Sequence, residues 1–210
     1  MKKLTTLGIL LLGSGMAAAM PLQIAGKPGF AIPQGSTFKD NYDSQFQLAV
    51  AIEGATESWV KPIMELGYNA GHDPEDITTA GVKTQKDGGE LSITYLTPGV
   101  KLVKETQVGS WKVEPFALGG LGLFQGHTSS FKTKTNGVET GTTASDSNGG
   151  WAVNLGVGVG VKPTTQFTVA FDLRYQVFAD KLALTKVSDG TTKRENPVFL
   201  TPGVLLSYKF

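Results

Sequence analysis

Apolar and polar residues alternate at every second position through most of this chain. The clearest run lies in residues 151–161, where the apolar members are Trp151, Val153, Leu155, Val157, Val159 and Val161. A period of two is typical of β-strands, because successive side chains of a strand point to opposite faces, whereas an amphipathic helix repeats every three or four residues. We therefore expect a chain built of strands.

Similar alternation marks eight segments in all. The predicted strands are residues 22–32, 46–54, 60–69, 91–103, 111–124, 151–162, 167–177 and 198–210. Pro28, which lacks a backbone donor, interrupts the first of them. In residues 91–103 the apolar positions change parity near Tyr95 and Leu96, which predicts either a bulge or the point where the strand leaves the membrane. In residues 111–124 both faces carry apolar side chains, so a strand is predicted there without an assigned face.

The connections between these strands alternate in length. Short links fall at 55–58, 104–110 and 163–166, and long polar links fall at 70–89, 125–149 and 179–196. Outer-membrane barrels have short periplasmic turns and long external loops. The pattern therefore predicts an all-β fold, a transmembrane antiparallel up-and-down β-barrel of about eight strands. We expect residues 128–148 to form a mobile, solvated external loop.

The two faces of the predicted strands differ in chemistry. One face carries no Lys, Arg, Asp or Glu in the regular segments, as a surface in contact with hydrocarbon requires. The charges of the other face should point into the lumen, and they are Glu53, Lys61, Glu65, Lys101, Glu114, Asp172 and Arg174. An eight-stranded barrel is just wide enough for side chains to fill, so these charges form either a narrow polar path or a plug of salt bridges.

The hairpin links suggest which of these lumen residues meet. We expect Lys101 opposite Glu114, across the 104–110 turn, and Glu53 near Lys61, across the 55–58 turn. In the hairpin of residues 150–178, we expect Gly156 opposite Arg174 and Gly158 opposite Asp172. Each glycine would then make room for a charged side chain.

The N-terminus is typical of an export signal. Lys2 and Lys3 precede an apolar stretch from Leu4 to Met16, and three alanines end at Ala19. This pattern predicts a cleavable signal peptide over residues 1–19 and a barrel domain over residues 20–210. The chain has no cysteine, which excludes disulfides and thiolate metal sites, and its net charge of +1 gives no case for nucleic-acid binding.

The C-terminus carries a family resemblance. It reads Val-Leu-Leu-Ser-Tyr-Lys-Phe over residues 204–210, and Leu-Thr-Pro-Gly-Val occurs at both 96–100 and 200–204. These features resemble small bacterial outer-membrane β-barrels of the outer membrane protein W, X and A type. The resemblance implies residence in the outer membrane, contact with its lipid, insertion by the outer-membrane assembly machinery, and a C-terminal insertion signal of Leu206, Tyr208 and Phe210. It implies no catalytic residue.

Aromatic residues near the segment ends fit an interfacial girdle. These residues are Trp59, Trp111, Trp151, Phe167, Tyr208 and Phe210.

Two histidines offer candidate chemistry. The loop from Gly71 through His72 to Asp76 could hold a cation, but a hydrated loop with a turn at Asp73-Pro74 is the favoured interpretation. His127-Thr128-Ser129 is similar to the His-x-Ser arrangement of outer-membrane lipid A deacylases, although Ser130 stands where that family has Asn. We expect no metal, no cofactor and no enzymatic activity.

Three functions are compatible with these sequence features. The leading one is a non-enzymatic barrel that serves envelope integrity or limited passage of small solutes. The second is a surface-loop adhesin or docking protein for other envelope components, and the third is a lipid-modifying hydrolase.

Overall fold

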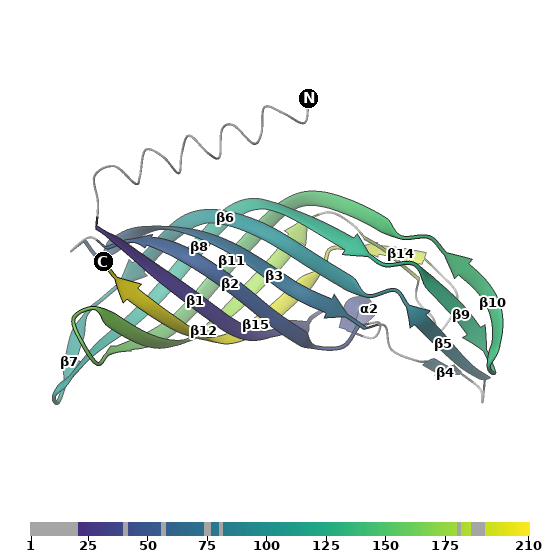
Figure 1. Ribbon diagram of the computed structural model, residues 1–210, viewed down its shortest axis with the longest axis horizontal. Coiled ribbons are helices and arrows are strands. Elements are labelled where there is room, and N and C mark those ends of the chain that lie inside the picture. The colour runs from purple at the N-terminus through teal and green to yellow at the C-terminus, as the bar shows by residue number, and fades with distance from the viewer. Residues whose placement is uncertain are drawn as a thin grey trace, which may run out of the picture.

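Eight long antiparallel strands wind around one closed barrel (Figure 1). The computed structural model describes residues 21–39, 42–55, 58–73, 77–79, 82–179, 182–185 and 192–210. The signal peptide expected at residues 1–19 lies outside these. The barrel strands are β1 (Leu22–Pro33), β2 (Gln45–Gly54), β3 (Val60–His72), β6 (Leu91–Val103), β8 (Trp111–Thr128), β11 (Asp146–Lys162), β12 (Phe167–Ala179) and β15 (Val198–Lys209).

Each barrel strand pairs with its neighbours along the chain, and the last pairs with the first. The β15–β1 seam runs from Gln23 opposite Lys209 to Pro33 opposite Phe199. Closure leaves none of the eight strands with a free edge, which is the condition for strands to cross a membrane. The predicted eight-stranded barrel is therefore confirmed. No helix among the described residues is long and apolar enough to span a bilayer.

The outer surface of the barrel is apolar. Leu155, Val157 and Val159 are about half exposed, while Ala152, Asn154 and Gly160 on the same strand are buried. Trp59, Trp111 and Trp151 are among the most exposed side chains. Such a surface would be insoluble in water and suits contact with lipid.

The bulge expected near Tyr95 is absent. Strands β3 and β6 keep one register from Lys61 opposite Lys101 to Asn69 opposite Ile93. The apolar parity changes because Ile93 and Tyr95 face an apolar part of the lumen, while Val100 and Leu102 face outward. The same cause explains β8, whose Phe116 is buried inside the barrel.

The long links build structure beyond the barrel. Strands β4 (Ile77–Thr79), β5 (Val82–Gly88), β9 (Phe131–Thr135) and β10 (Val138–Thr143) form a four-stranded sheet, seen at the right of Figure 1. A separate two-stranded sheet pairs β13 (Leu182–Thr185) with β14 (Thr192–Glu195). The segment of residues 128–148, expected as a mobile, solvated external loop, thus contains strands β9 and β10, and most of its side chains are exposed. Asn136 and Gly137 both have positive φ (50° and 82°), as a two-residue hairpin turn requires.

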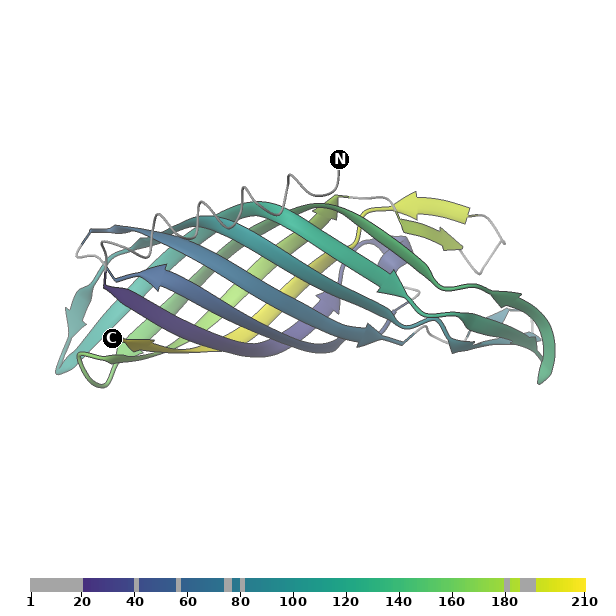
Figure 2. The same ribbon diagram turned by 45° about the horizontal axis from the view of Figure 1, so that its top comes forward.

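At the opposite end the connections are short. Strand β7 (Thr106–Val108) pairs with the start of β8, so this hairpin turns at Gly109 and Ser110. Strand β1 begins and β15 ends at this same end (Figure 2). The barrel thus has a short-turn end and a long-loop end.

A close approach between β6 and β8 gives a test of the packing. A Cβ atom on Gly122 would lie 1.9 Å from the backbone oxygen of Leu96, whereas one on Gly26 would meet nothing within 4 Å. We expect Gly122→Ala to destabilise the barrel by about 1–3 kcal/mol, as overpacking does, and Gly26→Ala to leave it unchanged. Urea unfolding in lipid vesicles measures both, and equal stabilities would contradict the close approach.

Candidate functional site in the barrel lumen

A set of buried charges crosses the middle of the lumen. The guanidinium of Arg174 donates from Nη1 to Glu65 Oε2 at 2.7 Å and from Nε to Asp172 Oδ2 at 2.6 Å. The Nζ atom of Lys27 lies 3.4 Å from Asp172 Oδ1. All four side chains are essentially inaccessible to solvent. Two cations thus balance two carboxylates, and we call these four residues the charged layer.

Neutral polar groups extend the charged layer to other strands. Glu65 Oε1 accepts hydrogen bonds from the Tyr95 hydroxyl at 3.0 Å and from Asn154 Nδ2 at 2.9 Å. Gln47 donates to the Tyr95 hydroxyl at 2.7 Å and to Gln176 Oε1 at 3.1 Å. Together, these hydrogen bonds and the ion pairs of the charged layer form a network across the lumen, and six of the eight barrel strands contribute side chains to it. Because the bonds join strands across the lumen, they close it and brace its wall.

Glycines in the wall make room for these side chains. Gly156 pairs with Arg174 and Gly158 with Asp172, so both predicted register positions are confirmed. A Cβ on Gly156 would lie 2.5 Å from Arg174 Cδ. A Cβ on Gly158 would instead meet the Phe116 ring at 2.4 Å. The expectation that Gly158 makes room for a charge is therefore wrong, because Phe116 of the adjoining strand occupies that space.

The expected partners nearer the short-turn end are corrected by the structure. Lys101 Nζ bonds both oxygens of Glu53 at 2.9 Å, and Glu114 Oε1 lies 2.7 Å from Lys162 Nζ. The expected position of Lys101 opposite Glu114 is thus wrong. Glu53 lies opposite Ile63, two residues from Lys61, and its ion pair is with Lys101. Because the hairpin turns at Gly109, Lys101 lies opposite Leu118 on β8, four residues from Glu114.

The structure places the seven predicted charges as follows. Glu53, Glu65, Lys101, Glu114, Asp172 and Arg174 are buried, and Lys61 is half-buried. Sequence reasoning missed Lys27 and Lys162. Each has the parity of its strand's inward residues, and this parity was the signal that could have identified them.

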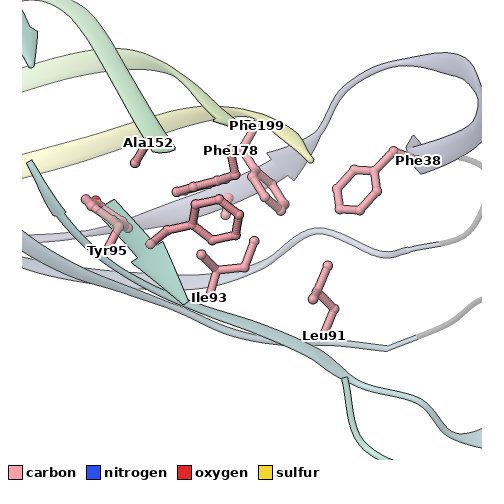
Figure 3. Packing of buried hydrophobic residues seen from close by; sticks show 9 residues of the cluster. Phe38, Leu91, Ile93, Tyr95, Ala152, Phe178 and Phe199 are labelled. Atoms are coloured by element: carbon pink, nitrogen blue, oxygen red, sulfur yellow. The ribbon is translucent and has the colours of Figure 1, made fainter. Parts of the chain in front are cut away.

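An apolar cap closes the long-loop side of the lumen. It comprises Ala31, Phe38, Leu91, Ile93, Tyr95, Phe124, Ala152, Phe178 and Phe199. Phe38 belongs to the one-turn helix α2 (Ser36–Lys39), and its ring lies 5.2 Å from that of Phe199. Figure 3 shows these rings turned toward one another inside the barrel. Phe38, which follows β1, therefore packs into the lumen. Tyr42 packs on this cap, and burial raises its pKa to about 12.

A cavity of about 1310 Å³ opens at the short-turn end. Its lining includes Lys61, Glu114, Phe116, Lys162 and Thr168, with residues of the short connections around them. We call this space the vestibule. The charged layer and the apolar cap lie above this cup. The lining also includes Leu102, Pro115 and Ala117, whose side chains face outward, so the vestibule extends around the rim of the barrel.

The structure shows the surroundings of both histidines singled out in the sequence. His72 is buried, donates from Nδ1 to the Asp43 carbonyl at 2.6 Å and stacks on Phe199 at 4.8 Å. Residues 74–76 of that loop lie outside the described residues. The described part of the chain contains no group of three or more His, Cys, Asp or Glu side chains arranged to hold a metal ion.

The second histidine, His127, does not bond the serine of the His-x-Ser sequence. His127 Nδ1 lies 2.8 Å from Ser147 Oγ on the neighbouring strand. The Ser129 hydroxyl instead accepts hydrogen bonds from the backbone N–H groups of Gly89 and Glu90, both at 3.0 Å. The His-x-Ser pairing is therefore wrong, because Ser129 is engaged by the β5–β6 connection.

The C-terminal residues lie on the outer surface at the seam. Leu206, Tyr208 and Phe210 are all exposed, and the rings of Tyr208 and Phe210 are 5.0 Å apart. The N–H of Phe210 donates to the Leu22 carbonyl at 3.1 Å. The exposed side chains of the predicted insertion signal thus lie on the strand that closes the barrel.

Comparisons with known proteins agree with this architecture. Residues 7–210 match the model of the outer membrane protein β-barrel domain family. Neisserial surface protein A is 11% identical with a TM-score of 0.57, over 90% of this chain and 97% of its own. OprG of Pseudomonas aeruginosa is 12% identical with a TM-score of 0.58, over 91% of this chain and 96% of its own. No curated protein matches the sequence closely enough to count as a relative. The chain therefore belongs to the outer membrane protein β-barrel family, as its resemblance to small barrels implied, and the outer membrane is its location.

Proposed function

We propose that this outer-membrane barrel serves envelope integrity and admits solutes only to a very limited extent. The observation that carries the proposal is the charged layer, in which Arg174 joins Glu65 and Asp172 across the middle of the lumen. The apolar cap adds a second barrier in series. A wall braced from within and closed along its axis suits a barrel that strengthens the membrane.

Conductance tests the closed lumen. Paired side chains that fill an eight-stranded barrel leave little continuous water, so we expect no large, stable conductance from the unmodified protein. Single-channel recording in planar bilayers measures it, with a known open porin as the positive control. A steady, porin-like current would contradict the proposal.

Envelope integrity is tested in cells. Deleting the gene should increase uptake of a hydrophobic dye that an intact outer membrane excludes, and the unmodified gene should restore exclusion. Uptake that does not change on deletion would refute the integrity role while leaving the closed lumen standing.

The barrel is proposed to act without catalysis. His127 and Ser147 do form a pair, but no acidic side chain bonds the imidazole among the described residues. A His–Ser pair needs a third group to orient the base and donors for the oxyanion. His127→Ala should therefore leave membrane lipid turnover unchanged, and a loss of turnover would favour the hydrolase.

The projecting sheet favours a second candidate function, surface docking. Both of its outer strands, β4 and β10, have an edge without a partner among the described residues. Such edges pair readily with other strands. Replacing residues 131–143 by a short turn should then reduce aggregation between cells that display the protein, while surface amounts stay equal.

A further inference from the structure

The periplasmic vestibule contains more positive than negative charge. Short turns of outer-membrane barrels face the periplasm, so the cup opens to that compartment. Seven charged residues line it: Lys61, Lys104, Lys112, Lys162, Lys209, Glu105 and Glu114. Five lysines thus face two glutamates.

Both glutamates are already engaged. Lys162 Nζ lies 2.7 Å from Glu114 and 2.9 Å from Glu105, and Lys112 Nζ lies 3.1 Å from Glu105. The hydrogen bonds from Lys162 and Lys112 lower the pKa of Glu105 to about 2, so this carboxylate is ionised at neutral pH. The remaining positive charge of the vestibule is therefore not cancelled by these carboxylates.

Lys61 is the half-buried lysine of this lining that has no carboxylate partner among the described residues, because none lies within ion-pair distance of its Nζ. Among the charges around it, Glu114 acts most strongly, followed by the like charges of Lys162 and Lys101. Glu53 adds a weaker attraction. A half-desolvated ammonium beside two others favours an added anion, because desolvation strengthens the attraction.

We propose that the vestibule binds a small soluble anion bearing phosphate or carboxylate groups, taken from the periplasm. The space is about 1310 Å³, including the part at the rim outside the lumen, and is large enough for such an anion. Ser58, Ser110, Thr164, Thr165 and Thr168 add hydroxyl donors to the lining. Ammonium groups bind phosphate as point charges, so several lysines around one cup suit a multivalent anion.

Calorimetry with the full-length protein in a non-ionic detergent tests the proposal, with sodium pyrophosphate as the probe and maltose as a neutral control. We expect saturable binding of pyrophosphate that weakens with salt, and none of maltose. Lys61→Gln should weaken binding about tenfold, the effect of losing one charge-assisted hydrogen bond. Lys132→Gln makes the same charge change on the external hairpin and should leave the affinity unchanged.

Three results would overturn the proposal. One is the absence of heat with pyrophosphate, and another is equal affinity of the Lys61→Gln and unmodified proteins when both show the heat-modifiable mobility of a folded barrel. The third is displacement of pyrophosphate by phosphatidylglycerol added to the micelles, which would assign the site to a lipid headgroup. Absence of displacement supports a soluble anion. None of these outcomes depends on whether the lumen conducts.

Discussion

Arg174→Ala is expected to destabilise the barrel by about 3–5 kcal/mol, because it breaks a buried ion pair from one side. The guanidinium is fully buried and holds two carboxylates, Glu65 at 2.7 Å and Asp172 at 2.6 Å. After its removal only Lys27 remains to balance two buried negative charges. The midpoint of urea unfolding in lipid vesicles measures the loss. Removal of the side chain that fills the middle of the lumen should also raise conductance in planar bilayers.

Two further variants separate charge balance from lost volume. Arg174→Met with Glu65→Gln removes one cation and one carboxylate, and it leaves Lys27 and Asp172 as a matched pair. We expect this double variant to recover much of the lost stability. Lys112→Ala breaks the exposed pair with Glu105 and should cost about 0–1 kcal/mol. A loss in Arg174→Ala no larger than that in Lys112→Ala would refute a structural role for the charged layer.

The barrel strands could be predicted because one face of the wall contacts lipid and the other faces the lumen. Side chains of a strand point to these two faces alternately, which imposes a period of two on the sequence. Residues 91–103 were expected as a strand, and β6 has these same bounds. The wrong prediction of a bulge within that strand also comes from reading the alternation. Alternation assumes one apolar face, but Ile93 and Tyr95 face an apolar cap inside the barrel. A lumen that changes from charged to apolar along its axis therefore reverses the pattern without any change in the backbone.

The ion pairs were harder to predict than the faces. Parity alone places Lys101 and Glu114 in the lumen, but their partners depend on where each hairpin turns and how far the strands are staggered. Strand β7 continues the pairing to Gly109, and this shifts Lys101 away from Glu114. The external hairpin had a local signal, since Asn136-Gly137 is typical of a two-residue turn. Its polar, threonine-rich flanks gave no apolar face to support a strand.

Deleting residues 208–210 is expected to cause the largest loss of all, a strong reduction in outer-membrane insertion. The deletion removes Tyr208, which lies opposite Ile24 on one side and Phe167 on the other. It also removes the hydrogen bond from Lys209 N to the Gln166 carbonyl at 2.8 Å. The seam would then lose its last pairs at the periplasmic end, where closure must remove open edges. The amount of heat-modifiable protein in the outer-membrane fraction measures insertion.

A side-chain variant distinguishes recognition from closure. Phe210→Ala keeps the backbone bond to Leu22 but removes the terminal ring. We infer that the assembly machinery reads the exposed aromatic side chains, so this variant should insert poorly in cells yet refold into detergent as well as the unmodified protein. The deletion variant should fail in both settings, because the seam itself is incomplete. Normal accumulation of the truncated chain as a heat-modifiable membrane species would defeat the closure argument. Normal insertion of Phe210→Ala would instead leave backbone pairing at the seam as the feature on which assembly depends.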